Sequence, residues 1–280
     1  MKHWFIFLSV LSVLGWGNET FNGKSALIVL PLPAGKISVG DTNLSVVAHP
    51  RDRTKGIVIV PVDYYASEGD YNITWNAPGK NLPIDLNVRN AFYPSETLSV
   101  DPAKVTPPPE AMERIEQEKA EAEALYATFT PIRYWDEPFI RPMDSNITSV
   151  YGAKRTYNGT LKSYHGGVDF RARTPQPILA ANNGVVVLAK ERYYAGDTVI
   201  IDHGEGIYSC YFHLSRYNVK AGQYVRKGEV IGLTGATGRI TGPHLHFGMM
   251  VHSRQTDPLY LIERINGLFE KESDATVASR

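Results

Sequence analysis

Cysteine is almost absent from this sequence, because Cys210 is the only one among 280 residues. A single cysteine excludes an internal disulfide framework, and none lies near the N-terminus to carry a lipid. The fold must therefore rest on packing. The alternation in the segment YSCYFHL predicts that Cys210 is a small buried residue and not a reactive thiol.

An excess of charge is also missing, since 29 Lys and Arg residues balance 29 Asp and Glu residues. This balance gives no global field that would favour nucleic acid or an anionic membrane surface as a partner. Hydrophobic residues make up 43% of the chain and charged residues 21%, a globular composition long enough for one large or two modest domains. We therefore expect no nucleic-acid partner and a function that depends on a local site.

The chain contains no apolar run of the roughly 20 residues that a membrane-spanning helix needs. The first residues, MKHWFIFLSVLSVLGWG, place Lys2 before a short apolar core, and small residues follow it. This pattern predicts a signal peptide over residues 1–17, with an uncleaved anchor as the alternative. We accordingly expect an exported protein of the periplasm or cell envelope.

The sequence is rich in short segments that are typical of β-strands. Short β-prone runs (ALIVL, LSVVAH, GIVIVPV, YNITW and IDLNV) alternate with turn residues, and they predict a small β-sandwich-like module over residues 24–104. Residues 105–134 are predicted to form a linker, in which a proline cluster is followed by a helix from Glu110 to Tyr126. Its weak apolar face indicates docking on a neighbouring surface.

The second half of the chain becomes strand-rich again. The segment GVVVLAKERYYAGDTVIIDHGEGIYSCYFHLS predicts three strands joined by two hairpin turns, the second at residues 203–206. Residues 135–265 are expected to form one antiparallel β domain, and residues 266–280 a C-terminal tail. The predicted fold class is mainly β.

The segment GPHLHFGMM places two histidines one residue apart. In a strand, residues two apart share a face, so His244 and His246 are expected to point one way while Leu245 and Phe247 point the other. A buried imidazole needs a polar partner, and packing alone does not supply one. We therefore interpret this strand as part of a site.

Two further segments carry candidate groups. In SYHGGVDF the two glycines argue against a helix, and on an extended segment His165 and Asp169 share a face. Nitrogen ligands combined with a carboxylate form the three-residue set of catalytic zinc sites, which leaves a position open for water. In YFHL the alternation places His213 on the same face as Tyr211 and opposite Phe212.

Eight histidines are present, and four of them lie in strand-like contexts that can converge. The other four are expected to have no role in the site: His3, His49, His203 and His252.

In their order along the chain, these motifs make the sequence resemble the lysostaphin-type, or LytM-like, zinc endopeptidases of bacterial cell wall. The resemblance covers residues 149–257, including SVYGAKRTYNGTLKSYHGGVDF, IIDHGEGIYSCYFHLS, GRITGPHLHFGM and DPLYL. It implies a duplicated hybrid motif as the fold, one Zn²⁺ per chain and peptidoglycan as the substrate. Where the family usually has Gly-Thr-Pro, this chain has TPQP at residues 174–177.

The resemblance also implies roles for individual residues. His165, Asp169 and His246 would be the metal ligands, and His213 and His244 the catalytic pair that does not bind the metal. Arg155 and Asn158 lie in a loop that is expected to line the substrate groove. Tyr211 is a candidate for an additional donor, with a packed aromatic as the alternative. The resemblance does not fix which of the two catalytic histidines acts as base.

Several alternatives remain open from the sequence. The domain could be a catalytically silent wall-binding protein or an activator of other hydrolases. A biotinyl or lipoyl carrier is disfavoured, since no lysine after Lys227 lies at a hairpin tip before the HLH strand. The N-terminal module could bind wall, dock a membrane or envelope partner, cover the groove or give plain support. The cleaved bond, a D-alanyl cross-link or a glycine bridge, and the oligomeric state are not predicted.

Overall fold

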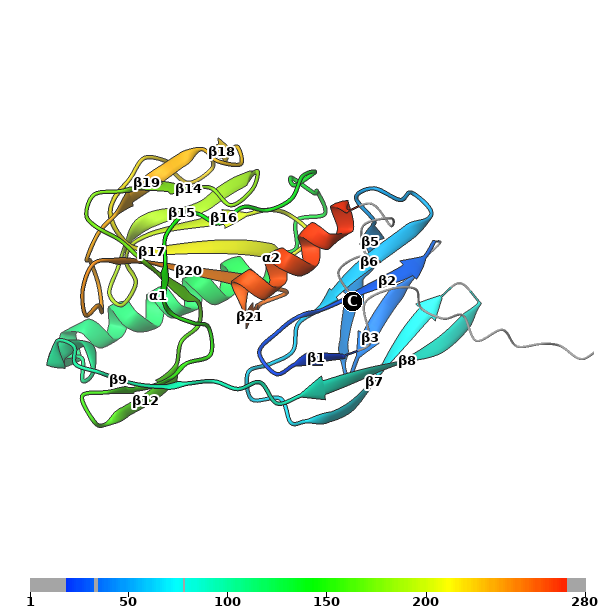
Figure 1. The fold of residues 1–280 in the computed structure, drawn as a ribbon, viewed down its shortest axis with the longest axis horizontal. Coiled ribbons are helices and arrows are strands. Elements are labelled where there is room, and N and C mark those ends of the chain that lie inside the picture. Colours follow the sequence, from blue (N-terminus) through cyan, green and yellow to red (C-terminus); the bar gives the residue numbers. More distant parts are fainter. Residues whose placement is uncertain (1–18, 33–34, 78, 271–280) are drawn as a thin grey trace, which may run out of the picture.

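The computed structural model describes residues 19–32, 35–77 and 79–270 (Figure 1). The predicted signal peptide lies outside the described residues, as do residues 271–280 of the predicted tail. Among the described residues, no helix is both long and apolar enough to cross a membrane.

Two sheets form the N-terminal part of the chain. Their strands are β1 (Glu19–Phe21), β2 (Ala26–Pro31), β3 (Lys36–Val39), β4 (Thr42–Ser45), β5 (Val47–Ala48), β6 (Lys55–Val60), β7 (Gly69–Ala77) and β8 (Lys80–Arg89), and β9 (Ser95–Leu98) follows outside both sheets. The order β1-β8-β7-β3-β4 makes one sheet and β2-β6-β5 the other. One apolar cluster joins them, with Val58 from the small sheet and Ile37, Ile73 and Val88 from the large one. This two-layered arrangement is what alternating short strands favour.

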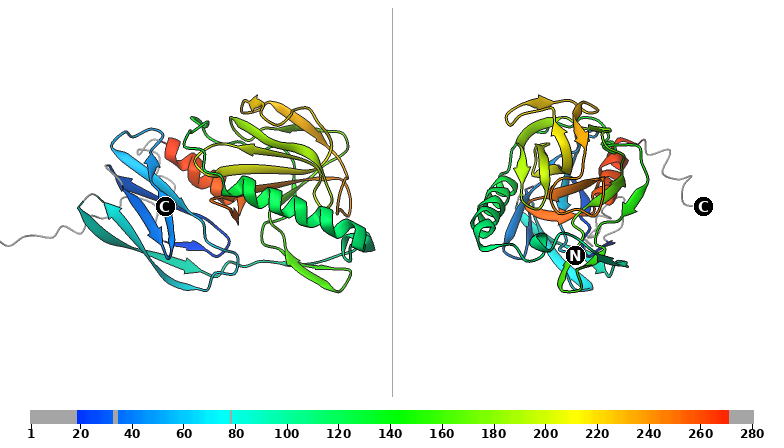
Figure 2. Two further views of the ribbon diagram at one scale, coloured as in Figure 1. Left: turned by 180° about the vertical axis from the view of Figure 1, so that it is seen from behind. Right: turned by 90° about the vertical axis from the view of Figure 1, so that its left-hand side faces the viewer.

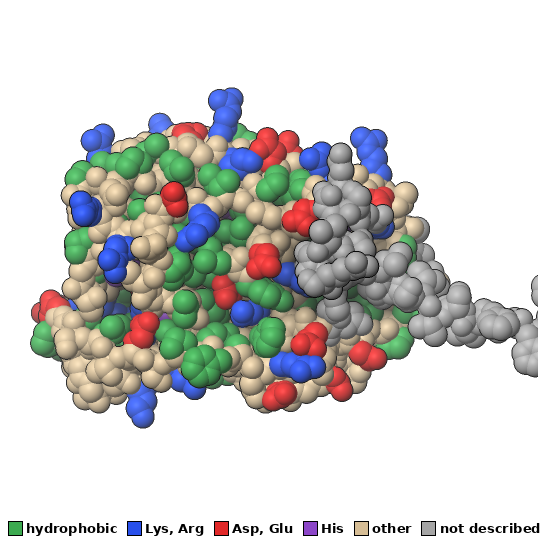
Figure 3. Space-filling model, in the orientation of Figure 1, with side chains coloured by type: hydrophobic (Ala, Val, Ile, Leu, Met, Phe, Trp, Pro, Cys, Tyr) green, Lys and Arg blue, Asp and Glu red, His purple; other side chains and the backbone are tan. Residues whose placement is uncertain are grey.

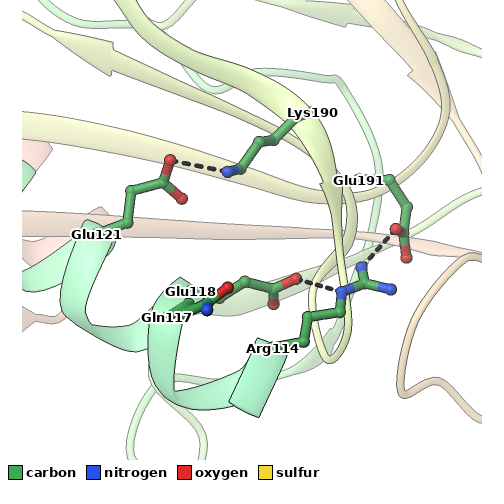
Figure 4. Close-up of a pocket in the computed structure, with 6 residues that line it drawn as sticks. All are labelled: Arg114, Gln117, Glu118, Glu121, Lys190 and Glu191. Atoms are coloured by element: carbon green, nitrogen blue, oxygen red, sulfur yellow. Dashed lines mark hydrogen bonds and ion pairs between the residues drawn. The ribbon is translucent and has the colours of Figure 1, made fainter. Parts of the chain in front are cut away.

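A linker helix follows this module. After the short 3-10 helix η1 (Pro102–Lys104), α1 runs over Pro109–Ala127, close to the expected Glu110–Tyr126. None of its residues is buried. It lies along the outside of the second domain (Figure 2). Ion pairs join it there to strand β15 (Gly184–Arg192). Figure 4 shows these pairs, Arg114 with Glu191 and Lys190 with Glu121, around a hollow of about 390 Å³.

The second domain is built on a ten-stranded antiparallel sheet. Its strands and those of the adjacent hairpin are β10 (Ile147–Ser149), β11 (Lys154–Tyr157), β12 (Leu161–Tyr164), β13 (Val168–Arg171), β14 (Pro177–Leu179), β15 (Gly184–Arg192), β16 (Gly196–Asp202), β17 (Ile207–Tyr217), β18 (Tyr224–Val225), β19 (Val230–Thr234), β20 (His244–Val251) and β21 (Arg254–Thr256). The path is β10-β13-β20-β17-β16-β15-β18, with β14, β19 and β21 paired beside it. The three predicted strands are β15, β16 and β17, and both hairpin turns are confirmed.

One helix was not anticipated in this half. Helix α2 (Pro258–Asn266) begins at Asp257, whose side chain accepts hydrogen bonds from the amides of Leu259 and Tyr260, and is followed by the 3-10 helix η2 (Gly267–Phe269). It buries Leu261, Ile262 and Ile265. The segment DPLYLIERIN carries both an N-cap residue and a helical apolar pattern, so the signal was present in the sequence.

The two halves share one core. An apolar cluster includes Leu27 and Ile57 from the N-terminal sheets and Trp135 and Phe247 from the second half. Strand β9 leaves the N-terminal module and pairs in parallel with β11 (Figure 1). On the face seen in Figure 3, acidic and basic side chains are interspersed, in keeping with the balanced composition.

Candidate metal centre and active site

Three adjacent strands place the predicted site residues next to one another. Strand β13 pairs with β20 so that Asp169 lies opposite His246. Strand β20 also pairs with β17, where Phe212 lies opposite His246. His165 lies three residues before the first residue of β13 and is 1% exposed. The candidate centre is therefore a cross-strand arrangement at the middle of the sheet.

The donor atoms of three side chains meet at short distances. His165 Nε2 lies 2.9 Å from Asp169 Oδ1 and 2.9 Å from His246 Nδ1, and His246 Nδ1 lies 3.0 Å from Asp169 Oδ1. All three residues are buried. Among the described residues, this is the group of histidine, cysteine and acidic side chains that could hold a metal ion. The structure thus brings together the three residues that the family resemblance implied as ligands.

Neighbouring groups fix the orientation of these ligands. His165 Nδ1 lies 2.9 Å from the carbonyl oxygen of Val150, to which it donates when neutral, so that Nε2 keeps its lone pair. Gly167 leaves room for the ring of His246, because a Cβ atom there would lie 2.6 Å from His246 Nε2. Phe212 stacks on the same ring, with centroids 5.1 Å apart and an angle of 3° between the planes.

The remaining two histidines lie beside this group. Their ring centroids are 5.0 Å apart, and His244 Nε2 is 3.5 Å from Asp169 Oδ1. His213 Nδ1 donates to the carbonyl oxygen of Thr237, and His244 Nδ1 to that of Gly242, each over 2.8 Å. Both Nε2 atoms then remain available for exchange of a proton.

A β-bulge directs His213 toward the centre. The register of β16 and β17 shifts between Asp197 and Val199, and His213 has a φ of 65°, which is uncommon outside glycine. The strict alternation predicted for YFHL is therefore wrong beyond Phe212. Phe212 faces His246, while Tyr211 points to the opposite side, into the core.

Burial controls the protonation of these groups. It lowers the pKa of His246 to about 4, and it lowers the pKa of His213 to about 3 with help from the charges of His244 and His246. Burial alone would raise the pKa of Asp169, but the neighbouring His165 and His246 outweigh this effect and hold the pKa well below its usual range. At neutral pH this gives a neutral His246 and an ionised Asp169, the forms that bind metal ions.

The three residues considered for substrate binding each have hydrogen-bond partners within the protein. Tyr211 is 0% exposed and its hydroxyl accepts a hydrogen bond from the amide of Ala181, so it is a packed aromatic and makes no substrate contact. Asn158 exchanges hydrogen bonds with the backbone of Val100. Arg155 contacts Asp169 Oδ2 at 2.7 Å and thus lies behind the metal centre. Sequence reasoning missed this support, although SVYGAKR contains both Ser149 and Arg155.

The other described histidines all have local partners away from the centre. His203 is fully buried between the carbonyl oxygen of Asn183 and the hydroxyl of Ser209. His49 Nδ1 accepts from the amides of Arg51 and Asp52. His252 stacks on Phe129. His3 lies outside the described residues.

Known proteins resemble this chain over the same region. The model of peptidase family M23 matches residues 163–258. The peptidoglycan DD-endopeptidase ShyA of Vibrio cholerae is 37% identical over 143 residues, which are 50% of this chain and 33% of ShyA. Lysostaphin of Staphylococcus staphylolyticus is 39% identical over 111 residues, 39% of this chain and 23% of lysostaphin. The chain therefore spans about a third or less of the length of these relatives.

A solved structure resembles nearly the whole chain. A Pseudomonas aeruginosa protein classed as a peptidase M23 is 28% identical, with a TM-score of 0.68, and the match covers 86% of this chain and 94% of that one. The likeness extends over most of the chain and is not confined to the residues of the metal centre.

Proposed function

Because residues 163–258 form a peptidase family M23 domain, we propose that this protein is a zinc-dependent endopeptidase that hydrolyses peptide cross-links or stem peptides of peptidoglycan. The observation that carries the proposal is the convergence of His165, Asp169 and His246 at 2.9–3.0 Å, beside two further histidines. Two imidazoles and one carboxylate are a donor set of catalytic zinc sites, which keep one position open.

The dimensions of the ligand group support zinc. Zinc binds nitrogen and oxygen at about 2.0–2.1 Å in a tetrahedron, so its ligands lie roughly 3.3 Å from one another. The observed separations of 2.9–3.0 Å need an expansion of only a few tenths of an ångström. Zinc in such a site lowers the pKa of a bound water to about 7 and polarises the carbonyl group under attack.

His213 and His244 perform the proton transfers in this proposal. Their Nδ1–H groups are held by backbone carbonyls, so each ring presents Nε2 toward the centre in a fixed orientation. One imidazole accepts a proton from the attacking water, and a proton is returned to the departing amine. The ring that has accepted the proton donates a hydrogen bond from Nε2–H to the oxyanion of the tetrahedral intermediate before this proton passes to the amine. Which of the two acts as base is left to kinetic measurement.

The substrate class is inferred from the relatives. ShyA, ShyB and ShyC of Vibrio cholerae are named peptidoglycan DD-endopeptidases, and a Neisseria meningitidis relative is named a DD-carboxypeptidase/endopeptidase. We propose a D-alanyl cross-link as the bond cleaved, in preference to the glycine bridge. Action on this substrate requires export to the cell envelope, which fits the signal peptide predicted for residues 1–17.

The rival function is a silent wall-binding protein. It is disfavoured because all five predicted metal-binding and catalytic side chains are present and lie together. A binding-only protein has no need to keep three ligands and two further imidazoles in one buried cluster. Retention of muropeptides without hydrolysis by the zinc-loaded protein would support this rival.

Digestion of defined muropeptides tests the proposal. Purified full-length protein is incubated with cross-linked muropeptide dimers, and the products are identified by mass spectrometry, with and without chelator and after zinc is restored. We expect monomers from dimers, loss of the reaction on chelation and recovery with zinc. Release of only a terminal D-alanine would indicate a carboxypeptidase, and intact dimers with zinc bound would contradict the proposal.

A further inference from the structure

A chain of polar side chains leads from the N-terminal module to the metal centre. It starts at Glu96 on β9, the strand that leaves this module and pairs in parallel with β11 (Figure 1). In this register Glu96 lies opposite Arg155. Both residues also line a groove of about 760 Å³ between the module and the β11–β12 hairpin.

Both carboxylate oxygens of Glu96 are used in this chain. Oε1 accepts from the hydroxyl of Ser149 at 2.7 Å, and Oε2 accepts from Arg155 Nε at 3.0 Å. A carboxylate that accepts from two separate donors fixes the orientation of both. The acidic group of the module thus holds two side chains of the second domain.

These two side chains contact two of the three ligands. Arg155 donates to Asp169 Oδ2 at 2.7 Å, so that Asp169 Oδ1 is the oxygen that faces His165 and His246. The hydroxyl of Ser149 lies 3.0 Å from His165 Nδ1. The path from Glu96 to the centre therefore has two branches, each with a single intervening residue.

The charges along this path alternate. The guanidinium of Arg155 lies between the carboxylates of Glu96 and Asp169, and their side chains are 12%, 23% and 6% exposed. At such burial solvent screens these charges only weakly. Without Glu96 the positive charge of Arg155 would be compensated by Asp169 alone, which would weaken the attraction of Asp169 for a cation.

We propose that Glu96 is a positioning residue through which the N-terminal module orients Asp169 and His165 for zinc. The inference rests on the function proposed above, because it assigns a role toward the same metal. Supporting residues of this kind typically change metal affinity by about 10- to 100-fold when removed. The module is then a structural component of the metal site.

The variant Glu96→Gln in the full-length protein tests this role. It keeps the size of the side chain but places an NH₂ group against Arg155 or Ser149, both of which now donate to the carboxylate. Zinc affinity is measured by competition with a chelating dye, and thermal unfolding of the zinc-free protein is measured in parallel. We expect zinc affinity to fall by about 10- to 100-fold with little change in the unfolding temperature.

A matched control uses the same substitution elsewhere in the module. Glu68 accepts from Asn90 Nδ2 at 2.7 Å and has no contact with the metal centre, so Glu68→Gln should leave zinc affinity unchanged. If Glu96→Gln fails to fold, Ser149→Ala interrupts the branch to His165 and is expected to weaken zinc binding several-fold.

The possible outcomes separate the two proposals. Wild-type protein that binds zinc and cleaves muropeptides, together with a folded Glu96→Gln that binds zinc equally well, would overturn the role of Glu96 and leave the enzyme function intact. Equal binding by Ser149→Ala would have the same meaning if it is the variant that folds. Wild-type protein that binds no zinc would remove the proposed function itself.

Discussion

Gly167 lies so close to His246 that a methyl group on its α carbon would be 2.6 Å from His246 Nε2 and 2.5 Å from the carbonyl oxygen of Phe247. Contacts of this length force a shift of the ring or of the strand. Gly167, in the segment between the first two ligands, is thus required by the third ligand, His246, which lies on a different strand. A short sequence motif and a distant histidine are in this way parts of one structure.

The first prediction concerns this contact. Gly167→Ala should displace His246, weaken zinc binding by about 10-fold or more and cost roughly 1–3 kcal/mol of unfolding free energy. Chelator competition and urea unfolding measure the two effects. Gly242→Ala is the control, because a Cβ atom there meets nothing within 4 Å. Equal zinc affinities for the two variants would show that the fit of Gly167 against His246 is not needed.

The second prediction separates ligands from catalytic groups. His213→Ala and His244→Ala should each keep about one zinc per chain and lose about 10²- to 10⁴-fold in the rate of cross-link hydrolysis, because a proton-transfer group is removed while all three ligands stay. Metal analysis and single-turnover rates on muropeptide dimers measure both quantities. A zinc-free His244→Ala would reassign that residue as a ligand.

The third prediction concerns the stability of the zinc-free protein at low pH. Burial lowers the pKa of His203 from 6.5 to about 4. Above pH 6.5, the pKa of histidine in the unfolded chain, His203 is neutral in both the folded and the unfolded protein. As the pH falls from 6.5 toward 4, only the unfolded protein takes up a proton at this residue, so the free energy of unfolding falls by up to roughly 3 kcal/mol.

Urea unfolding at pH 7.5 and pH 4.5 measures this effect. His203→Gln should be less stable than wild type at pH 7.5 and should lose less stability on acidification. His49→Gln is the control, because His49 is only partly buried and burial has a smaller influence on its pKa. If the stability of His203→Gln fell with pH as steeply as that of the wild type, His203 would not be the residue that destabilises the folded protein in acid.

The fourth prediction concerns Cys210. Its thiol is buried, burial raises its pKa to about 12, and its sulfur lies 3.2 Å from the hydroxyl of Tyr126. We expect no reaction with a thiol reagent at pH 8 in the folded protein and full reaction in denaturant, since the thiolate is the reactive form. Rapid labelling of folded protein would show that the packing of α1 against β17 opens readily.

Part of this structure could be predicted from residues close together in the sequence. The strands β15 to β17 follow from alternation and turn residues, and α1 follows from its helix formers and its prolines. The five histidine and aspartate positions follow from three motifs in a fixed order. These features depend on local sequence, so they can be seen without coordinates.

Other parts depend on contacts that the sequence does not reveal. The bulge at His213 breaks the alternation that placed Phe212 away from the site, and only the pairing of β16 with β17 shows it. The contacts of Arg155 with Glu96 and Asp169 could not be predicted, because these partners come from β9 and β13. Pairing between distant segments sets these positions, and one sequence does not encode it in any short pattern.

Anomalous X-ray scattering at the zinc absorption edge, from crystals of the full-length protein grown with zinc, tests the central claim most directly. The account predicts one strong peak bounded by His165 Nε2, Asp169 Oδ1 and His246 Nδ1, and its disappearance in His246→Ala. A peak coordinated by other residues, or none at this position in zinc-saturated wild-type crystals, would contradict it.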